Sequence, residues 1–271
     1  MYLVSPCIIN IKQKIGFPLD LTCTSSAVCT LACALLLAVY NLPPSSTMSL
    51  TPSFETCDAH LHVWTDDYPY VKPPPSALAG SVASFENLLA TMDTNGVSRS
   101  VIVQPSNYAF DHTYVLQAMS RHPERLAVVL LLDPTLSPTE ASKFIRDMVK
   151  RGCTGIRFNP SLFPEGRLDT DTGRAAFRTA SELGGIPISV MAFTGLRNVA
   201  DSITLLANEF SNVPLILDHF GFPREKPAES PSKELQFDEE SFALLLRMGS
   251  DLSTLHVKIS ALFRVSSLAV S

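Results

Sequence analysis

Short apolar runs alternate with longer amphipathic segments between residues 54 and 260. The runs rich in β-branched and aliphatic residues cover residues 54–60, 100–104, 126–132, 154–158, 186–192, 213–218 and 255–260. The segments with helical spacing cover residues 84–95, 112–121, 138–151, 171–183, 198–209 and 239–249. This repeated order of strand and helix predicts a parallel sheet with helical crossover connections. Residues 128–132 and 214–217 are apolar throughout, which favours strands that are buried on both faces.

Seven predicted strands leave two α/β architectures open. A (β/α)8 TIM barrel needs an eighth strand and helix, and the sequence stops 11 residues after residue 260. A doubly wound open sheet accommodates seven strands, but the sequence contains neither a GxGxxG fingerprint nor a P-loop. The nucleotide chemistry that usually accompanies such a sheet therefore has no support here.

The first 54 residues differ in composition from the rest. They hold three charged side chains, Lys12, Lys14 and Asp20, and residues 27–40 are nearly all apolar. This apolar stretch is short for a bilayer span but suits a secretory signal, while the low acidity and the many serines and threonines suit an organellar transit peptide. A third alternative is that Met48 begins the working protein. We treat residues 1–50 as a targeting, hydrophobic or disordered extension and begin the domain at residue 51.

Charge and cysteine usage narrow the class of protein further. A net charge of −5 argues against a nucleic-acid partner, which requires a basic face. Four of the six cysteines lie in the first 33 residues, so we expect no disulfide scaffold. We expect Cys57 and Cys153 to be buried thiols in a reducing compartment, which favours a cytoplasmic or organellar location. Contact with a membrane is expected only if residues 27–40 act as a signal or anchor.

The stretch from Asp58 to His62 carries the strongest chemical signal. Side chains of a strand alternate between its faces, so Asp58, His60 and His62 point the same way. Two imidazoles on one strand face can converge on a divalent cation, an activated water or a substrate oxygen. Two histidines separated by one residue are common in sequences. The alternative interpretation is therefore that these two are unrelated and lie on a half-exposed strand.

Other polar side chains stand where further predicted strands end. In a βα barrel the chemistry lies at these carboxyl ends. His219 belongs to this level and is more consistent with a functional histidine, whereas His112, His122 and His256 have structural explanations. Arg157 is a candidate anion clamp. The remaining candidates at this level are Gln104, Asn159, Asp218, Lys258 and, just beyond the last strand, Arg264.

Three of the candidates, Lys258, Asp58 and Asp218, also have a structural interpretation. Lys258 suits either the binding of an anion or a buried ion pair. For Asp58 and Asp218 the structural interpretation is that their carboxylates only orient the neighbouring histidines.

Five motifs, in order and at barrel-like spacing, resemble the amidohydrolase-related superfamily. The likeness is to the branch of TIM-barrel metal-dependent hydrolases that includes the 2-pyrone-4,6-dicarboxylate lactonases, and it covers residues 54–264. The matching segments are Asp58-Ala59-His60-Leu61-His62-Val63-Trp64, Val101-Ile102-Val103-Gln104-Pro105, Gly155-Ile156-Arg157-Phe158-Asn159-Pro160, Leu217-Asp218-His219-Phe220-Gly221 and Val257-Lys258-Ile259-Ser260-Ala261-Leu262-Phe263-Arg264.

The resemblance implies a hydrolase built on a TIM barrel. It implies that His60, His62 and His219 surround the reacting carbonyl, with His60 and His62 as candidate ligands of one divalent metal such as zinc. Metal-binding members usually have a histidine on the fifth strand, where this sequence has Met191 and Phe193. A metal-independent mechanism of the lactonase type is therefore the alternative. The residues expected to bind an anionic substrate are Gln104, Arg157, Asn159, Lys258 and Arg264.

The likeness ends at residue 266, before the family's eighth strand and its catalytic aspartate. We therefore expect an incomplete (β/α)8 TIM barrel over residues 51–266, a divergent tail over 267–271, and a truncated product in which the general base is missing. The leading functional hypothesis is hydrolysis of a small anionic lactone or cyclic ester. The alternatives are a metal-dependent decarboxylase and an inactive binding module. The oligomeric state is left open.

Overall fold

The computed structural model describes residues 7–10, 56–78, 80–224 and 237–261. All of them belong to one unit formed by residues 1–13 and 55–271. The apolar stretch 27–40, Arg264 and the tail 267–271 lie outside the described residues. The boundaries of the extension and of the tail therefore stay predictions.

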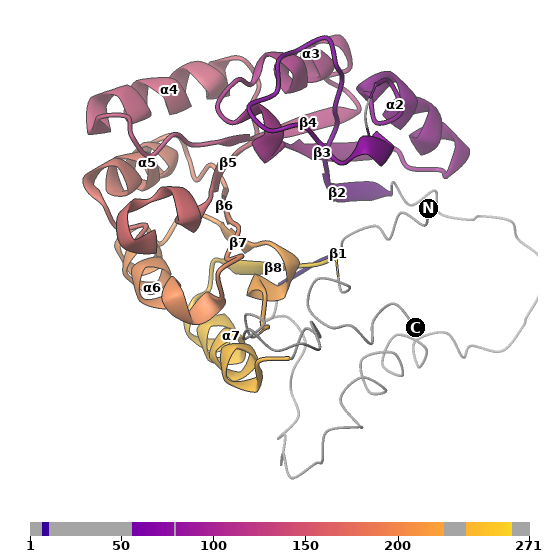
Figure 1. Cartoon of the computed structure of the whole chain (residues 1–271). Coiled ribbons are helices and arrows are strands. Elements are labelled where there is room, and N and C mark those ends of the chain that lie inside the picture. Colours follow the sequence, from indigo (N-terminus) through magenta and orange to yellow (C-terminus); the bar gives the residue numbers. More distant parts are fainter. Residues whose placement is uncertain (1–6, 11–55, 79, 225–236, 262–271) are drawn as a thin grey trace, which may run out of the picture. The chain divides into compact units, whose positions relative to one another are not determined.

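Seven parallel strands and six helices alternate along the described chain (Figure 1). The parallel strands are β2 (Cys57–Leu61), β3 (Arg99–Val103), β4 (Leu126–Leu131), β5 (Gly155–Phe158), β6 (Ile188–Val190), β7 (Leu215–Leu217) and β8 (Leu255–Ile259). The helices are α2 (Phe85–Thr94), α3 (Thr113–Arg121), α4 (Pro138–Lys150), α5 (Asp171–Glu182), α6 (Ala200–Glu209) and α7 (Glu239–Asp251). The predicted βα barrel architecture with seven parallel strands is confirmed.

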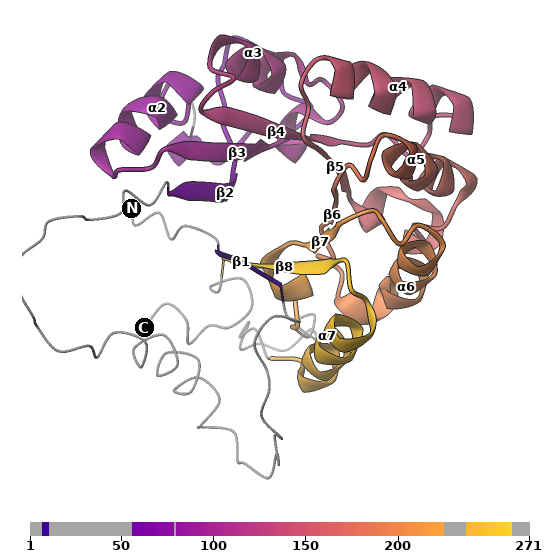
Figure 2. The same cartoon turned by 180° about the vertical axis from the view of Figure 1, so that it is seen from behind.

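Each parallel strand pairs with the next one in the chain, from β2 through to β8. The strands form a curved sheet, and the helices lie along its outer side (Figure 1, Figure 2). The carboxyl ends of all seven strands consequently meet at one end of the sheet. This arrangement brings side chains from distant parts of the sequence to one site.

Local sequence signals account for where the helices begin. Ser137 and Glu140 form a capping box at the start of α4, with Pro138 in its first turn. Ser84, Thr170 and Asp238 each accept a hydrogen bond from a backbone N–H in the first turn of the following helix. These caps satisfy amide groups that would otherwise lack partners.

The core lies between the sheet and the inward faces of the helices. Strand β5 shows how the alternation works. Phe158 points outward and packs edge-on against Phe177 of α5, with 5.6 Å between the ring centroids. Arg157, the preceding residue, points to the opposite side and reaches Asp218. One face of the strand thus builds the core and the other builds the site.

An additional strand, β1 (Cys7–Asn10), pairs antiparallel with β8. Cys7 is opposite Ile259 and Asn10 is opposite His256. The sheet order is therefore β1-β8-β7-β6-β5-β4-β3-β2. From their composition, residues 1–50 are expected to form an extension outside the barrel domain. A four-residue strand whose partner lies near the other end of the chain has no local signal that would reveal it.

One prediction about the cysteines is wrong. Cys57 is exposed rather than buried, because it is the first residue of β2 and alternation turns it away from Asp58. Cys153 is buried as expected. Burial raises the pKa of its thiol to about 11, so it is a packing residue. Within the described segments, the helices all fall short of the length and apolarity that crossing a bilayer requires.

Candidate active site

Three imidazoles meet at the carboxyl ends of β2 and β7. The ring centroids of His60 and His62 are 5.2 Å apart, and those of His60 and His219 are 4.6 Å apart. His60 lies within β2, His62 directly follows it, and His219 opens the short 3-10 helix η7 (His219–Gly221) after β7. The structure thus brings together the three histidines selected from the sequence. Their catalytic roles stay predictions.

A strained turn holds His219 in place. His219, Phe220 and Phe222 have φ values of 52°, 57° and 52°, and Gly221 between them has a φ of 69°. For residues other than glycine this left-handed conformation costs about 1–2 kcal/mol each. Such strain persists where the surrounding structure enforces it, and it gathers at functional sites. Here the buried Phe222 packs edge-on against the His219 ring at 5.2 Å, and His219 Nδ1 lies 2.7 Å from Ser260 Oγ.

A backbone carbonyl fixes the tautomer of His62. Its Nδ1 lies 2.7 Å from the carbonyl oxygen of Val103. A carbonyl oxygen only accepts, so Nδ1 carries the hydrogen and Nε2 of the neutral ring carries a lone pair. Burial lowers the pKa of His62 well below its ordinary value, and nearby His60 and Arg157 lower it further. His62 is therefore neutral near pH 7.

Asp218 is the centre of a buried charge network next to these rings. Its side chain is inaccessible to solvent. Oδ2 accepts hydrogen bonds from Arg157 Nε at 3.2 Å and from Ser189 Oγ at 3.0 Å. Oδ1 lies 3.3 Å from His60 Nδ1 and 3.4 Å from Lys258 Nζ. Four strands thus supply partners to a single carboxylate.

Two cationic side chains contact the carboxylate of this network. Burial alone would raise the pKa of Asp218, but His60, Arg157 and Lys258 hold it well below its usual range. Burial lowers the pKa of Lys258, and the Asp218 carboxylate opposes that effect. Burial likewise lowers the pKa of His60. The guanidinium of Arg157 and the ammonium of Lys258 thus lie together at the strand ends, and cationic groups there favour an anionic ligand nearby.

The other sequence-selected residues make mainly structural contacts. Asp58 accepts a hydrogen bond from the backbone N–H of His60 at 3.1 Å, so it supports the strand rather than the ring. Gln104 Nε2 donates to the carbonyl oxygens of Ala109 and Asp111, at 3.2 and 2.8 Å. Asn159 Oδ1 accepts from the Ser161 N–H at 3.1 Å. Substrate contacts by Gln104 and Asn159 stay predictions.

Two residues of the site were not singled out from the sequence. Ser189 contributes a hydroxyl to Asp218, and Phe222 packs against His219. A serine within an apolar strand is a weak signal, although it shares the inward face of β6 at the level of Arg157 on β5. A phenylalanine after a glycine is indistinguishable from an ordinary core residue.

The described residues do not fit a zinc site. Catalytic zinc takes three protein ligands from histidine, cysteine, aspartate or glutamate. Over the described ranges, no three such side chains are grouped so that they could hold one ion. Lys258 and Arg157 also place positive charge beside His60, which opposes a cation. Zinc at His60 and His62 remains a prediction, and no chemical step is derived through a metal.

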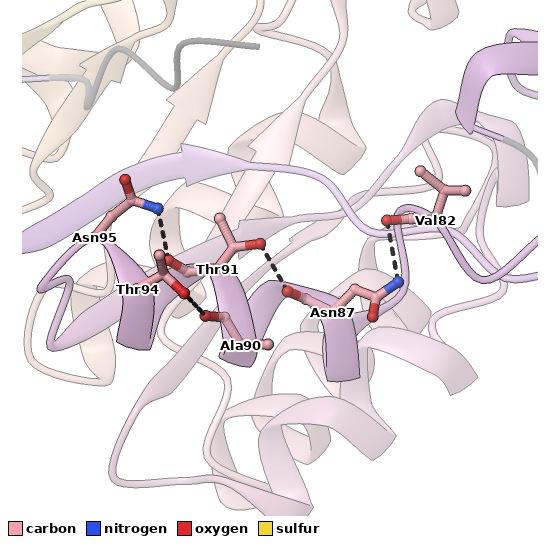
Figure 3. A pocket seen from close by; sticks show the side chains of 6 residues that line it. All are labelled: Val82, Asn87, Ala90, Thr91, Thr94 and Asn95. Atoms are coloured by element: carbon pink, nitrogen blue, oxygen red, sulfur yellow. Dashed lines mark hydrogen bonds between the residues drawn. The ribbon is translucent and has the colours of Figure 1, made fainter.

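A shallow hollow on the outer face of α2 offers no comparable chemistry (Figure 3). Three of its polar side chains bond to backbone carbonyls of the same helix. Thr91 Oγ1 donates to the Asn87 carbonyl, Thr94 Oγ1 to the Ala90 carbonyl, and Asn95 Nδ2 to the Thr91 carbonyl, at 2.8 to 2.9 Å. Their hydrogen-bonding capacity is largely used within the helix.

The βα barrel and the three clustered histidines are the features that the sequence resemblance to barrel hydrolases predicts. The family model described as Amidohydrolase matches residues 57–270. The chain belongs to this amidohydrolase family.

Individual relatives agree with this assignment. The chain is 31% identical over 168 residues to a 4-sulfomuconolactone hydrolase of Rhizobium radiobacter, a match that covers 60% of this chain and 52% of that protein. The protein of the same name from Hydrogenophaga intermedia is 27% identical over 173 residues, with the same two coverages. The chain thus spans about half the length of the curated relatives it matches.

A solved structure supports the fold. A probable 2-pyrone-4,6-dicarboxylic acid hydrolase of Acinetobacter baumannii, crystallised with citric acid, superposes with a TM-score of 0.55 at 19% identity. The match covers 78% of this chain and 72% of that one. At this identity the likeness supports the barrel fold alone.

Proposed function

We propose that this chain hydrolyses a small anionic lactone or cyclic ester whose carbonyl binds among His60, His62 and His219. The observation that carries the proposal is the meeting of three imidazoles beside a buried network that contains Arg157 and Lys258. Imidazole N–H groups in a site without bulk water stabilise the negative charge that develops on a carbonyl oxygen under attack. The names of the two curated relatives, both sulfonated-lactone hydrolases, support the same substrate class.

The anionic group of the substrate is the second part of the proposal. Arg157 and Lys258 are buried and both contact Asp218 at the strand ends, where cationic groups favour the binding of an anion. In this scheme the interaction is through the electric field of the network rather than through a single exposed cation. Gln104, Asn159 and Arg264 remain candidates for direct contact with the substrate.

The test is an initial-rate assay of ring opening by the purified 271-residue chain. The substrates are 4-sulfomuconolactone, 2-pyrone-4,6-dicarboxylate and an uncharged lactone. We expect turnover of an anionic lactone, preference over the uncharged one, and a loss of about 10²–10³ in kcat for His60→Ala. His122→Ala, a change at a partly exposed histidine after α3, is the matched control and should leave the rate unchanged.

Two results would contradict the proposal. One is the absence of hydrolysis with every anionic lactone, and binding without turnover would then favour the interpretation as a binding module. The other is release of carbon dioxide in place of ring opening, which would favour decarboxylation. Adding a chelator to the same assay measures directly whether activity depends on a metal.

A further inference from the structure

The ring nitrogen Nε2 of His60 is the feature from which this inference starts. This atom is buried and has no hydrogen-bond partner among the described residues. The whole side chain is 3% exposed. A buried nitrogen without a partner costs about 1–3 kcal/mol, so its persistence calls for an explanation. A ligand that bonds to Nε2 in the working site supplies this explanation. Whether the ligand atom is a donor or an acceptor depends on whether Nε2 carries a hydrogen.

The other ring nitrogen decides that state. His60 Nδ1 has two neighbours at 3.3 Å, Lys258 Nζ and Asp218 Oδ1. If Nδ1 accepts from the ammonium, Nε2 carries the hydrogen and is a donor. If Nδ1 donates to the carboxylate, Nε2 carries a lone pair and is an acceptor. The two neighbours therefore dictate opposite chemistry at the ligand-facing atom.

Direction separates the two neighbours. The approach of Lys258 Nζ satisfies the geometry of a hydrogen bond to Nδ1. Asp218 Oδ1, at the same distance from Nδ1, has no hydrogen-bond partner in the described part of the chain. Since an ammonium only donates, Nδ1 is the acceptor in this pair.

We propose that Lys258 is a positioning residue that holds His60 in the Nε2–H tautomer, opposite to the tautomer that Val103 imposes on His62. The HxH pair then presents one donor, His60 Nε2, and one acceptor, His62 Nε2, to the same ligand. Under the proposed function, on which this step depends, the donor binds the lactone carbonyl oxygen and the acceptor binds a hydrogen of the attacking water. Two adjacent histidines thus take different roles because their partners differ.

A nitrogen that carries a hydrogen cannot coordinate a metal ion. The proposal therefore also accounts for the poor fit of this histidine pair to zinc. It predicts that Lys258→Met, which removes the donor, turns the His60 Nδ1–H toward Asp218 and leaves a lone pair on Nε2. Asp218 keeps its bond to Arg157 in this variant, so one buried ion pair remains.

The test is a two-bond ¹H–¹⁵N correlation spectrum of the full chain labelled in its histidines, with His60→Gln and His62→Gln to assign the signals. In the wild type we expect the Nε2–H pattern for His60 and the Nδ1–H pattern for His62. Lys258→Met should switch His60 to the Nδ1–H pattern, and Lys258→Arg should restore the original pattern. Lys143→Met, at an exposed lysine of α4, should change neither signal.

Kinetics give a second readout. In Lys258→Met, kcat for lactone hydrolysis should fall about 10²–10³-fold, as when one oxyanion donor is lost. KM for an anionic lactone should rise as well, because the variant also removes a positive charge. A wild-type spectrum with His60 in the Nδ1–H form would overturn the inference, even if Lys258→Met failed to fold. So would an unchanged His60 pattern in a folded Lys258→Met variant. If both tautomers are as stated but no lactone is hydrolysed, the proposed function fails and the assignment of Lys258 stands.

Discussion

Removing the charge of Asp218 tests how the site is held together. Asp218 is fully buried, while Arg157 and Lys258 are 4% and 2% exposed. Asp218→Asn removes the carboxylate that both of these cations contact, so the formal charge next to them rises by one. The new amide group can also turn N–H donors toward the Lys258 ammonium, which is itself only a donor.

The expected cost follows from this loss of compensation. Breaking a buried ion pair by removing one partner destabilises a protein by about 3–5 kcal/mol. That is a large part of the total stability of a typical domain, about 5–15 kcal/mol. We therefore expect Asp218→Asn to lower the free energy of unfolding by about 3–5 kcal/mol at pH 7.

Urea unfolding measures this free energy by linear extrapolation. Trp64, the single tryptophan, follows β2, and its Nε1 donates to Asn107 Oδ1 at 2.9 Å. Its fluorescence therefore reports on unfolding of this side of the barrel. Asp147→Asn is the control. It breaks the exposed pair between Lys143 and Asp147, which solvent screens, and should leave the free energy of unfolding nearly unchanged.

The pH dependence gives an independent check. The pKa of Asp218 is lower in the folded chain than its ordinary value, so the unfolded chain binds more protons in acid. Its stabilising contribution is complete above about pH 4 and is lost as the pH falls through the folded pKa. Asp218→Asn should lack this component. Two results together would refute this reasoning. The free energy of unfolding of Asp218→Asn would lie within about 1 kcal/mol of the wild type, and the double variant Asp218→Asn/Lys258→Met would be no more stable than Asp218→Asn alone.

Three smaller predictions concern single residues of the same fold. Burial lowers the pKa of His112 to about 4, so between about pH 6.5 and 4 the unfolded chain binds a proton that the folded chain does not. The free energy of unfolding should therefore fall by about 3 kcal/mol as the pH drops through this range. Unfolding measured at a series of acid pH values should show this decrease reduced in His112→Gln. Ser100 Oγ is buried without a partner in the described structure, so Ser100→Ala should be neutral or raise the melting temperature, and a loss above 1 kcal/mol would indicate a hidden partner. Gly221→Ala should cost about 1–2 kcal/mol in urea unfolding for its positive φ alone, since the nearest atom to the new methyl group, on Leu196, is 3.5 Å away; a neutral result would argue against the left-handed turn.

The barrel could be predicted because its signals are local. Continuous apolar runs such as 126–131 mark strands buried on both faces, and capping residues such as Ser137 mark where helices begin. The repeated order of strand and helix then determines parallel pairing. The same logic placed His60, His62 and His219 at one end of the sheet, since all three follow or end a strand.

The interactions within the site could not be predicted in the same way. Whether Lys258 binds an anion or forms a buried ion pair depends on what lies opposite it, and Asp218 is 40 residues away in sequence. The left-handed turn at 219–222 has only Gly221 as a local signal. The pairing of β1 with β8 joins segments near opposite ends of the chain, and Cys57 was mistaken for a core residue because strand position, not residue type, determines its exposure.

A crystal structure of the chain with a bound anionic lactone, or with a slowly hydrolysed analogue, tests the central claim most directly. We predict that the carbonyl oxygen lies about 3 Å from His60 Nε2 and that the anionic group lies on the side of Arg157 and Lys258. A ligand bound away from the three imidazoles, or with its carbonyl turned from them, would contradict the account.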